Sequence, residues 1–388
     1  MVALLSLRRK ALSLIAGAVA LVGLAACDVP TIGGGPLINT SRAVPVALLV
    51  PKSSASAGSL AVSLENAARL AAGDLESVEI DLRVYDTGGT AAGAAAAAEQ
   101  ALDDGARIFV GPLFAEAAAS AGQVAAGRGV NVLAFSNNPS VAGGNVFILG
   151  NTFQTSADRL VRYAQSQGKG DIYIVHAADP AEESGRDAIQ RSIAANGARL
   201  AGTSSFALSQ QGVIDAIPQI ANGYRSSGAS AVFVTSGTSG ALPFLAELLP
   251  ENGVDADNAQ FIGLQRLDIP TSALSLGGLQ GAWFATPSPG LTARFNARYQ
   301  AAYGALPSPV AGLAYDGIAA IGALVAQGNS NALTAEALTQ GQGFAGVSGP
   351  FRFFRSGTNE RGLAVAQIQN NQVIVIDPAP RSFGGAGL

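Results

Sequence analysis

The chain has 388 residues, of which 48% are hydrophobic and only 13% are charged, and its formal net charge is −4. This length is sufficient for two domains with cores of their own, and the composition excludes an intrinsically disordered chain. The only lysines are Lys10, Lys52 and Lys169, so no basic patch for a nucleic acid is expected. A single His and a single Cys exclude a structural zinc site and a disulfide within the chain.

The first 26 residues have the pattern of a secretory signal peptide. Basic residues at positions 8–10 precede an apolar run of about a dozen residues, which is short for a membrane span. The run ends in the letters LAAC, which resemble the lipobox of bacterial lipoproteins and imply lipidation of Cys27. An ordinary signal peptide with a chance Cys is the alternative. We expect a periplasmic, membrane-anchored lipoprotein; Asp28 resembles an inner-membrane retention signal, but the choice of membrane stays open.

Residues 27–43 are rich in Gly, Pro and Ser and are expected to be a linker. Folded sequence begins at Val44, and residues 379–388 are expected to be a disordered tail. In the first part of the chain, apolar strands alternate with helices. Strands are expected at 44–50, 78–85, 107–110, 130–135 and 146–149, with helices at 60–73, up to 103, and after the Gly111-Pro112 break. This alternation predicts right-handed crossovers and a parallel sheet.

Ligands of such sheets bind outside the carboxyl ends of the strands. The polar and aromatic residues that follow these strands are therefore the candidate ligand contacts of the first part of the chain: Ser53, Ser54, Phe114, Glu116, Ser136, Asn137 and Asn138. The turn at 86–89, which connects a strand to an alanine-rich helix, belongs to the same edge. The pattern predicts a binding cleft and contains no catalytic group.

A second series of units begins after a crossover at 151–156. Strands are expected at 171–176, 199–206, 231–234, 260–263 and 281–285, with helices between them. Thr235, Ser236 and Gln265 follow two of these strands and join the candidate contacts, while Gly185-Arg186 is expected in a loop. Residues 287–289 return the chain to the first domain, where helices follow at 291–303 and 310–326; Tyr315 lies on the second. Segments 363–369 and 372–376 flank Asn370-Asn371 as an antiparallel hairpin.

These elements predict an α/β protein with two doubly wound, Rossmann-like lobes. The N-terminal lobe is expected to comprise residues 44–153 and 287–341, and the C-terminal lobe residues 154–286 and 342–378. Several short motifs occur in an order and spacing that support this organisation: VALLVP, YDTGG, ALDDGARIFVGPLF, GVNVLAFSN, SPVAGLAYDGIAAIGAL, FAGVSGPFRF and GLAVAQIQNNQVIVI.

With these motifs, the chain resembles the type I periplasmic binding proteins of the leucine-binding-protein-like group over Val44–Pro378. The resemblance implies a Venus-flytrap fold, in which three crossovers connect two lobes and a ligand binds at the hinge. Within this superfamily, the lipobox together with DTGGT, GPLFAEA and VLAFSNN resembles lipoproteins known as penicillin-binding protein activators. That resemblance implies a non-catalytic protein that contacts a peptidoglycan synthase. The alternative is a substrate-binding protein that delivers an amino acid or a similar small polar solute to the permease of an ABC importer.

The resemblance also implies which contacts an amino-acid ligand would require. Family members hold the carboxylate with a Ser just after the GPL motif, where this chain has Ala115 or Glu116, and a carboxylate would repel the ligand. Ser136 is retained, but Ser184 stands where an aromatic residue stacks on the ligand, and uncharged Gln265 stands near the acidic partner of the ammonium. Three of the four contacts are therefore missing, which favours another ligand or an empty cleft. Tyr315 is expected to pack against the cleft floor.

No residue pattern indicates an enzyme, a cofactor or a metal site. His176 ends an apolar strand, and a general base also requires a nucleophile or acid within reach. A structural His is expected there, because the chain has no G-x-S-x-G elbow. The run GQGFAG at 341–346 matches G-x-G-x-x-G but follows a helix rather than a strand, which is the reverse of the dinucleotide-binding context.

Overall fold

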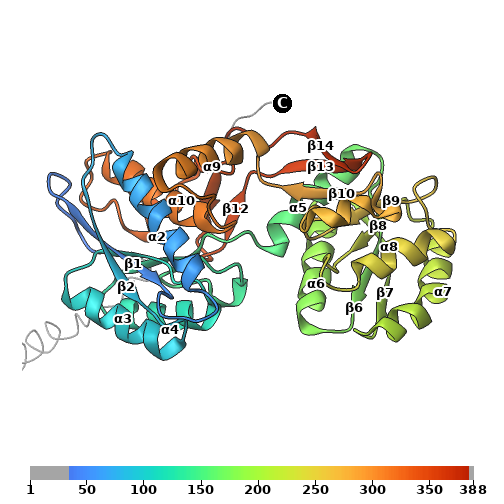
Figure 1. The fold of residues 1–388 in the computed structure, drawn as a ribbon, viewed down its shortest axis with the longest axis horizontal. Helices are drawn as coiled ribbons and strands as arrows, with labels where there is room; N and C mark the ends of the chain where they lie inside the picture. The colour runs from blue at the N-terminus through green and yellow to red at the C-terminus, as the bar shows by residue number, and fades with distance from the viewer. Residues whose placement is uncertain (1–34, 384–388) are drawn as a thin grey trace, which may run out of the picture.

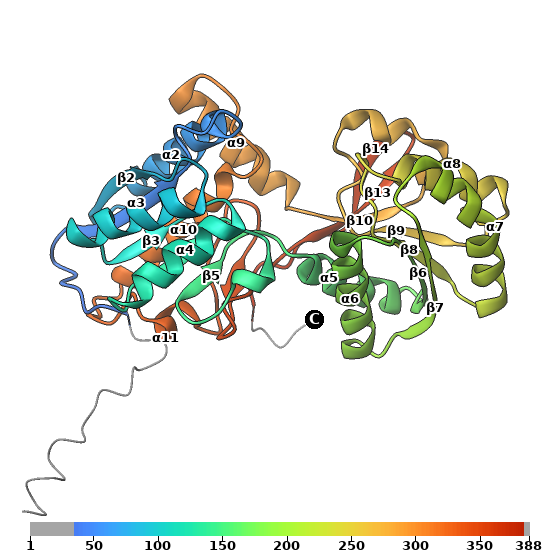
Figure 2. The same ribbon diagram turned by 90° about the horizontal axis from the view of Figure 1, so that it is seen from below.

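The computed structural model describes residues 35–383, which form two lobes side by side along the longest axis of the molecule (Figure 1). Each lobe has a mainly parallel sheet with helices on both faces, as Figure 2 shows from below. The predicted signal peptide and Cys27 lie outside the described residues. Within residues 35–383, no helix is long and apolar enough to cross a membrane.

The first lobe contains a parallel five-stranded sheet in the order β2-β1-β3-β4-β5. Its strands are β1 (Val44–Val50), β2 (Ile80–Asp86), β3 (Ile108–Val110), β4 (Asn131–Ala134) and β5 (Val146–Ile148). Helices α3 (Ala91–Asp103) and α4 (Ala115–Ala126) cover one face, and α2 (Gly58–Gly73), α9 (Pro289–Tyr303) and α10 (Ala311–Val325) cover the other. The short α11 (Ala335–Leu338) follows. β1 is buried on both faces, which explains its continuous apolar sequence.

Alanine determines how α3 and α4 pack. The buried side of α3 consists of Ala94, Ala97, Ala98 and Ala101, and α4 buries a matching row of alanines. Side chains this small allow two helices to approach closely, and alanine also has the best intrinsic helix propensity. Thr90 begins α3, because its side chain accepts a hydrogen bond from the Gly93 amide at 3.0 Å.

The second lobe contains a seven-stranded sheet in the order β14-β13-β10-β9-β8-β6-β7. The parallel strands are β6 (Asp171–Ala177), β7 (Arg199–Phe206), β8 (Ala231–Val234), β9 (Gln260–Gly263) and β10 (Trp283–Thr286). The predicted hairpin is confirmed as β13 (Ala364–Gln369) and β14 (Gln372–Asp377), which extends the sheet in antiparallel fashion. Helices α5 (Phe153–Ser166) and α6 (Pro180–Ala195) cover one face, and α7 (Gln210–Ser227) and α8 (Leu242–Glu251) cover the other.

The chain passes between the lobes three times, as the family resemblance implies. The first crossover follows β5 and ends at the start of α5, the second lies between β10 and α9, and the third leads from β12 (Asn359–Arg361) into β13. This arrangement is the two-lobed, doubly wound α/β fold expected from the alternation of strands and helices.

Two expectations about the chain path are corrected. Residues 342–361 were assigned to the second lobe, but Phe344, Phe351 and Phe353 pack in the core of the first lobe, where the ring of Phe353 lies 5.6 Å from that of Phe147. The hairpin of β11 (Phe351–Phe353) and β12 therefore belongs to the first lobe. Gly185 and Arg186 were placed in a loop but lie inside α6, which begins earlier because the side chain of Asp179 caps it.

Candidate ligand-binding cleft

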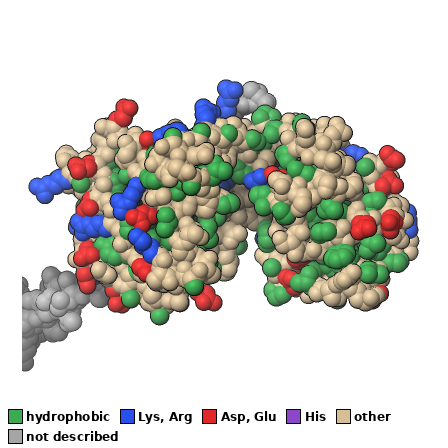
Figure 3. Space-filling view, in the orientation of Figure 1, with side chains coloured by type: hydrophobic (Ala, Val, Ile, Leu, Met, Phe, Trp, Pro, Cys, Tyr) green, Lys and Arg blue, Asp and Glu red, His purple; other side chains and the backbone are tan. Residues whose placement is uncertain are grey.

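A cavity of about 720 Å³ lies between the two lobes at the crossovers, and Figure 3 shows the hollow between the lobes in space-filling form. Both lobes and all three crossovers contribute to its lining. This volume is typical of small-molecule sites. Among residues 35–383, no cluster of three His, Cys, Asp or Glu side chains is placed to hold a metal ion.

Most of the cleft wall is apolar. The first lobe contributes Leu113, Phe114 and Phe135, which follow β3 and β4. The second lobe contributes Leu264 and Ile269, which follow β9. The remaining apolar lining residues are Phe153, Ala285, Pro287, Phe295, Pro307, Pro309, Val310, Leu313, Val347 and Leu363. Phe114 is 39% exposed and Ile269 is 50% exposed. Because these two side chains belong to different lobes, closing the lobes on a ligand would remove apolar surface from water.

Ser136 supplies a free hydrogen-bond donor at this wall. It follows β4, it is 4% exposed, and its Oγ accepts a hydrogen bond from the Asn138 amide at 3.1 Å. The hydroxyl proton therefore remains free for a ligand. Asn137 is exposed next to it and also lines the cleft. The side chain of Asn138 is instead used by the fold, because its Oδ1 accepts a hydrogen bond from the Ser140 amide at 2.9 Å and caps a short 3-10 turn.

The N-terminus of α4 points its first amides toward the same edge of the sheet. Phe114 is the N-cap residue and makes no side-chain cap, so the amides of the first turn have no side-chain acceptor. Glu116 lies in this first turn, where an acidic side chain stabilises the helix dipole. It is exposed and does not line the cavity, so the structure places it beside the cleft rather than in it.

The second lobe contributes few groups that are free to bind a charged ligand. Gln265 lines the cleft, and its Nε2 donates a hydrogen bond to the Thr235 carbonyl at 2.9 Å, which leaves its Oε1 free. Arg266 also lines the cleft, but Asp268 neutralises it through a two-pronged ion pair in which Nε lies 2.8 Å from Oδ1. The second lobe therefore contributes no unpaired charged side chain to the cleft.

The sequence predicts that Thr235 and Ser236 contact a ligand, but in the structure both hydroxyls make hydrogen bonds within the second lobe. They are 1% and 0% exposed, and their hydroxyls donate to the carboxylate of Glu182, at 2.9 Å from Thr235 and 2.7 Å from Ser236. The same carboxylate accepts the Ala177 amide at 2.6 Å. Two buried hydroxyls and one amide thus hold the start of α6 against β8, and neither hydroxyl lines the cleft.

Three other expected contacts lie away from the cavity. Ser53 and Ser54 belong to the loop after β1, where the Ser53 amide binds the carboxylate of Asp86 at 3.2 Å. Although Ser54 lies near Gly89 and Phe114 at the same edge of the sheet, neither serine lines the cleft. Tyr315 does not line the cavity either: its ring packs against Phe295, 5.7 Å away, and its hydroxyl donates to Asp74 at 2.6 Å.

A buried polar network joins the first and third crossovers. Arg361 is 6% exposed; its Nε donates to the Leu149 carbonyl at 2.7 Å and its Nη1 contacts Asp316 at 2.8 Å. Asn359 donates to the carbonyls of Ile148 and Gly150 at 2.6 and 2.9 Å. Burial raises the pKa of Asp316, and Arg361 opposes this rise. No local sequence pattern indicates these residues, because only the fold brings positions 148–150, 316 and 359–361 together.

His176 is a structural residue. It is 4% exposed, and its Nδ1 lies 2.8 Å from the Ala177 carbonyl oxygen. It does not line the cleft. The apolar lining from residues 307–313 and 347–348 was also missed, although the SPVAGLAYDG motif that contains part of it could have indicated the region.

Comparison with known proteins agrees with this geometry. A family model described as periplasmic binding protein matches residues 43–372. The chain belongs to the periplasmic binding protein family. Its type I, leucine-binding-protein-like fold is confirmed, and family membership implies a periplasmic location. A search of curated proteins finds no match.

Several solved structures share the fold of this periplasmic binding protein. A putative branched-chain amino acid ABC transporter protein from Rhodospirillum rubrum has a TM-score of 0.73 and 18% identity, and the match covers 86% of this chain and 100% of that chain. A branched-chain amino acid transporter substrate-binding protein from Streptococcus pneumoniae, in complex with isoleucine, has a TM-score of 0.57 and 15% identity, with coverage of 87% and 100%. An ABC transporter solute-binding protein from Rhodopseudomonas palustris BisB5, in complex with 3,4-dihydroxybenzoic acid, has a TM-score of 0.57 and 16% identity, with coverage of 88% and 98%.

Proposed function

We propose that this protein is a non-catalytic receptor that binds a small, largely apolar ligand without an ammonium group between its lobes. The observation that carries the proposal is the chemistry of the cleft wall. Its surface is apolar, with the free donor of Ser136 and the free acceptor of Gln265 placed at it, and its Arg266 is neutralised by Asp268. A zwitterion would lose its hydration there without gaining a charged partner for its ammonium.

In this proposal Ser136 and Asn137 hydrogen-bond the polar end of the ligand, while Phe114 and Ile269 close over its apolar part. Both bound ligands named among the similar structures, isoleucine and 3,4-dihydroxybenzoic acid, carry a carboxylate. A carboxylate or carbonyl group fits the donors of the first lobe, and the second lobe favours a ligand without an ammonium group. Aromatic acids and apolar amides are therefore preferred over free α-amino acids.

A thermal-shift screen of the full chain in detergent tests this proposal. The panel contains leucine, isoleucine, 3,4-dihydroxybenzoate and short apolar amides. A ligand at 100 times its dissociation constant adds about 2.7 kcal/mol, which corresponds to a shift of about 4 °C for about 350 ordered residues that unfold together. Ser136→Ala should abolish the shift, while Ser140→Ala, whose side chain lies on the same loop but outside the cavity, should preserve it. A shift with leucine alone, unchanged in Ser136→Ala, contradicts the proposal.

A second candidate function concerns the protein partner. The missing ammonium contact at Gln265 and the resemblance of the GPLFAEA segment to penicillin-binding protein activators favour docking on a peptidoglycan synthase over delivery of an amino acid to an ABC permease. Lipidation at Cys27 would hold the receptor at the membrane near such a partner. The test is co-purification of the lipidated chain with membrane proteins, with and without ligand. Recovery of a glycan-polymerising synthase supports this function, and recovery of a permease instead contradicts it.

A further inference from the structure

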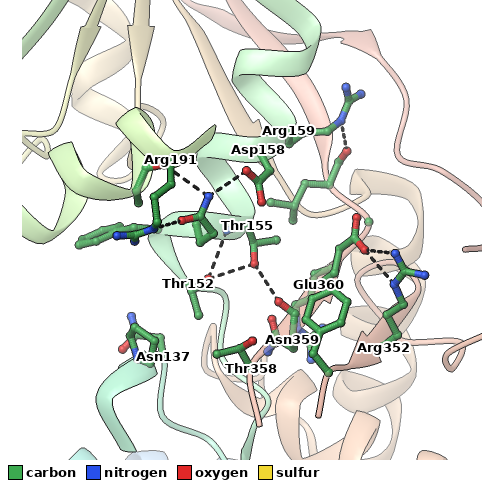
Figure 4. Close-up of a pocket in the computed structure, with 18 of the residues that line it drawn as sticks. Asn137, Thr152, Thr155, Asp158, Arg159, Arg191, Arg352, Thr358, Asn359 and Glu360 are labelled. Atoms are coloured by element: carbon green, nitrogen blue, oxygen red, sulfur yellow. Dashed lines mark hydrogen bonds and ion pairs between the residues drawn. The ribbon is translucent and has the colours of Figure 1, made fainter. Parts of the chain in front are cut away.

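A second cavity lies beside the cleft and is chemically different from it. Its volume is about 900 Å³, and it is lined by α5 and α6 of the second lobe and by the β11–β12 hairpin of the first lobe. Thr152, Phe153 and Arg361 line both cavities, so the first and third crossovers form the wall between them. Figure 4 shows Thr152, Thr155, Thr358 and Asn359 around its centre.

Positive charge is concentrated at this cavity. Five arginines line it, against two acidic residues. Three of them are ion-paired, Arg159 with Asp377, Arg352 with Glu360 and Arg361 with Asp316, whereas Arg162 and Arg191 make no ion pair within residues 35–383. Arg191 and Arg352 lie on opposite sides of the cavity in Figure 4 and come from different lobes.

Several of these guanidinium groups retain donors for a ligand. Arg191 donates through Nε to Gln154 at 2.9 Å, and its two terminal nitrogens make no hydrogen bond within residues 35–383. The Nη2 of Arg361 is buried and also has no partner in that part of the chain. Arg352 uses Nε and Nη2 to pair with Glu360, at 2.8 and 2.6 Å, and its guanidinium stacks over the ring of Phe354. Its Nη1 lies 3.5 Å from the Gly341 carbonyl oxygen and is the nitrogen that can still donate to a ligand.

We propose that this cavity is a binding site for a small organic anion with at least two anionic groups. One group pairs with Arg191 of the second lobe, and the other pairs with Arg352 of the first lobe. Planar guanidinium groups suit carboxylate and phosphate oxygens, because each can donate two parallel hydrogen bonds. Since the two arginines belong to different lobes, the bound anion connects the lobes at this side of the crossovers. The site is independent of the ligand proposed for the cleft.

Isothermal titration calorimetry of the full chain in detergent, at low ionic strength, tests the proposal with citrate, succinate and inorganic phosphate. Binding of citrate or succinate identifies a carboxylate ligand, and stronger binding of phosphate identifies a phosphorylated one. Arg191→Gln and Arg352→Gln should each weaken the binding at least about tenfold, because each removes charge-assisted hydrogen bonds. Added salt should weaken the binding as well.

Arg128→Gln is the matched control, because Arg128 is an exposed arginine that pairs with Asp103 at 3.6 Å and lines neither cavity. It should bind the anion as the unmodified chain does. Circular dichroism shows that each variant is folded before it is titrated. The proposal is overturned if none of the three probes binds, or if Arg191→Gln and Arg352→Gln bind as tightly as Arg128→Gln. It is also overturned if Ser136→Ala, rather than the arginine variants, abolishes binding, since the anion would then lie in the cleft.

Discussion

Replacing Asp316 by Asn should strongly destabilise the protein. The side chains of Asp316 and Arg361 are 0% and 5% exposed, and their ion pair is 2.8 Å long. In Asp316→Asn the new amide can still accept the Val347 amide, which now binds Oδ1 at 2.8 Å. Its NH2 group, however, faces the Arg361 guanidinium, donor against donor. A buried charge without its partner costs about 3–5 kcal/mol.

The double variant Asp316→Asn/Arg361→Met separates the ion pair from its surroundings. It removes the orphaned charge and keeps an apolar side chain of similar length over the Phe351 ring, which lies 4.8 Å from the guanidinium carbon. Its remaining cost is the loss of the hydrogen bond to the Leu149 carbonyl, about 1–3 kcal/mol. The double variant should therefore be more stable than Asp316→Asn alone, and the two substitutions should be coupled by about 2 kcal/mol.

Equilibrium urea denaturation followed by circular dichroism gives the free energy of unfolding of the parent, both single variants and the double variant. A cost below about 1 kcal/mol for Asp316→Asn would refute the argument that the pair is held without access to water. Strict additivity of the two single substitutions would also refute it. An unchanged slope with denaturant is the internal control, because it shows that all four proteins unfold the same amount of surface.

Four further substitutions test the fold at other places. Gly111→Ala should lower the free energy of unfolding by about 3 kcal/mol or more, because Gly111 has φ of +94° and a Cβ there would lie 2.2 Å from the Leu49 carbonyl oxygen. Gly105→Ala is the control: its φ is +89° but the space around it is open, so it should lower the free energy of unfolding less in the same denaturation assay. Leu64→Ala, in the core of the first lobe, should cost about 2–5 kcal/mol, and an equal loss for the exposed control Val62→Ala would contradict its burial. Thr90→Ala should cost about 1 kcal/mol by removing the cap of α3, while Ser59→Ala, on the exposed side of α2, should be neutral in thermal unfolding. Burial raises the pKa of Asp86, but hydrogen bonds from Gly88 and Ser53 outweigh it and lower this pKa, so the stability that the carboxylate contributes is present above about pH 4 and is lost as the pH falls through the lowered pKa. Asp86→Asn should therefore have a smaller free energy of unfolding than the parent at pH 7, and the two values should converge in acid. A gap between the two values that widens in acid would contradict the prediction.

Much of the architecture follows from local patterns. The continuous apolar segment at 44–50, the alanine helices and the break at Gly111 each specify their element from neighbouring residues alone. Their alternation then leaves few alternatives to two parallel sheets. The hairpin around Asn370-Asn371 is predicted correctly, because β-branched residues follow a turn that two asparagines mark in the sequence.

The polar residues of the cleft show where local pattern fails. Ser136 and Thr235 both follow apolar strands, and nothing near them in sequence distinguishes a free hydroxyl from an occupied one. The difference is made by Glu182, which lies 53 residues from Thr235 and reaches its hydroxyl only in the folded lobe. The third crossover is misplaced by the sequence for a similar reason. Phe351 and Phe353 are apolar enough for either core, and only the folded structure shows them in the first-lobe core, where Phe353 packs against Phe147.

The sequence by itself determined the two-lobed α/β fold, the order of its elements and the sheet edge at which a ligand binds, because hydrophobic periodicity and turn chemistry act over a few residues. Tertiary structure decided which side chains at that edge are free. Hydrogen bonds such as those from Asn359 to Ile148, 211 residues apart, use up some polar groups and leave others available. It also gathered arginines from α6 and β11 around one cavity, which no segment of the sequence contains by itself.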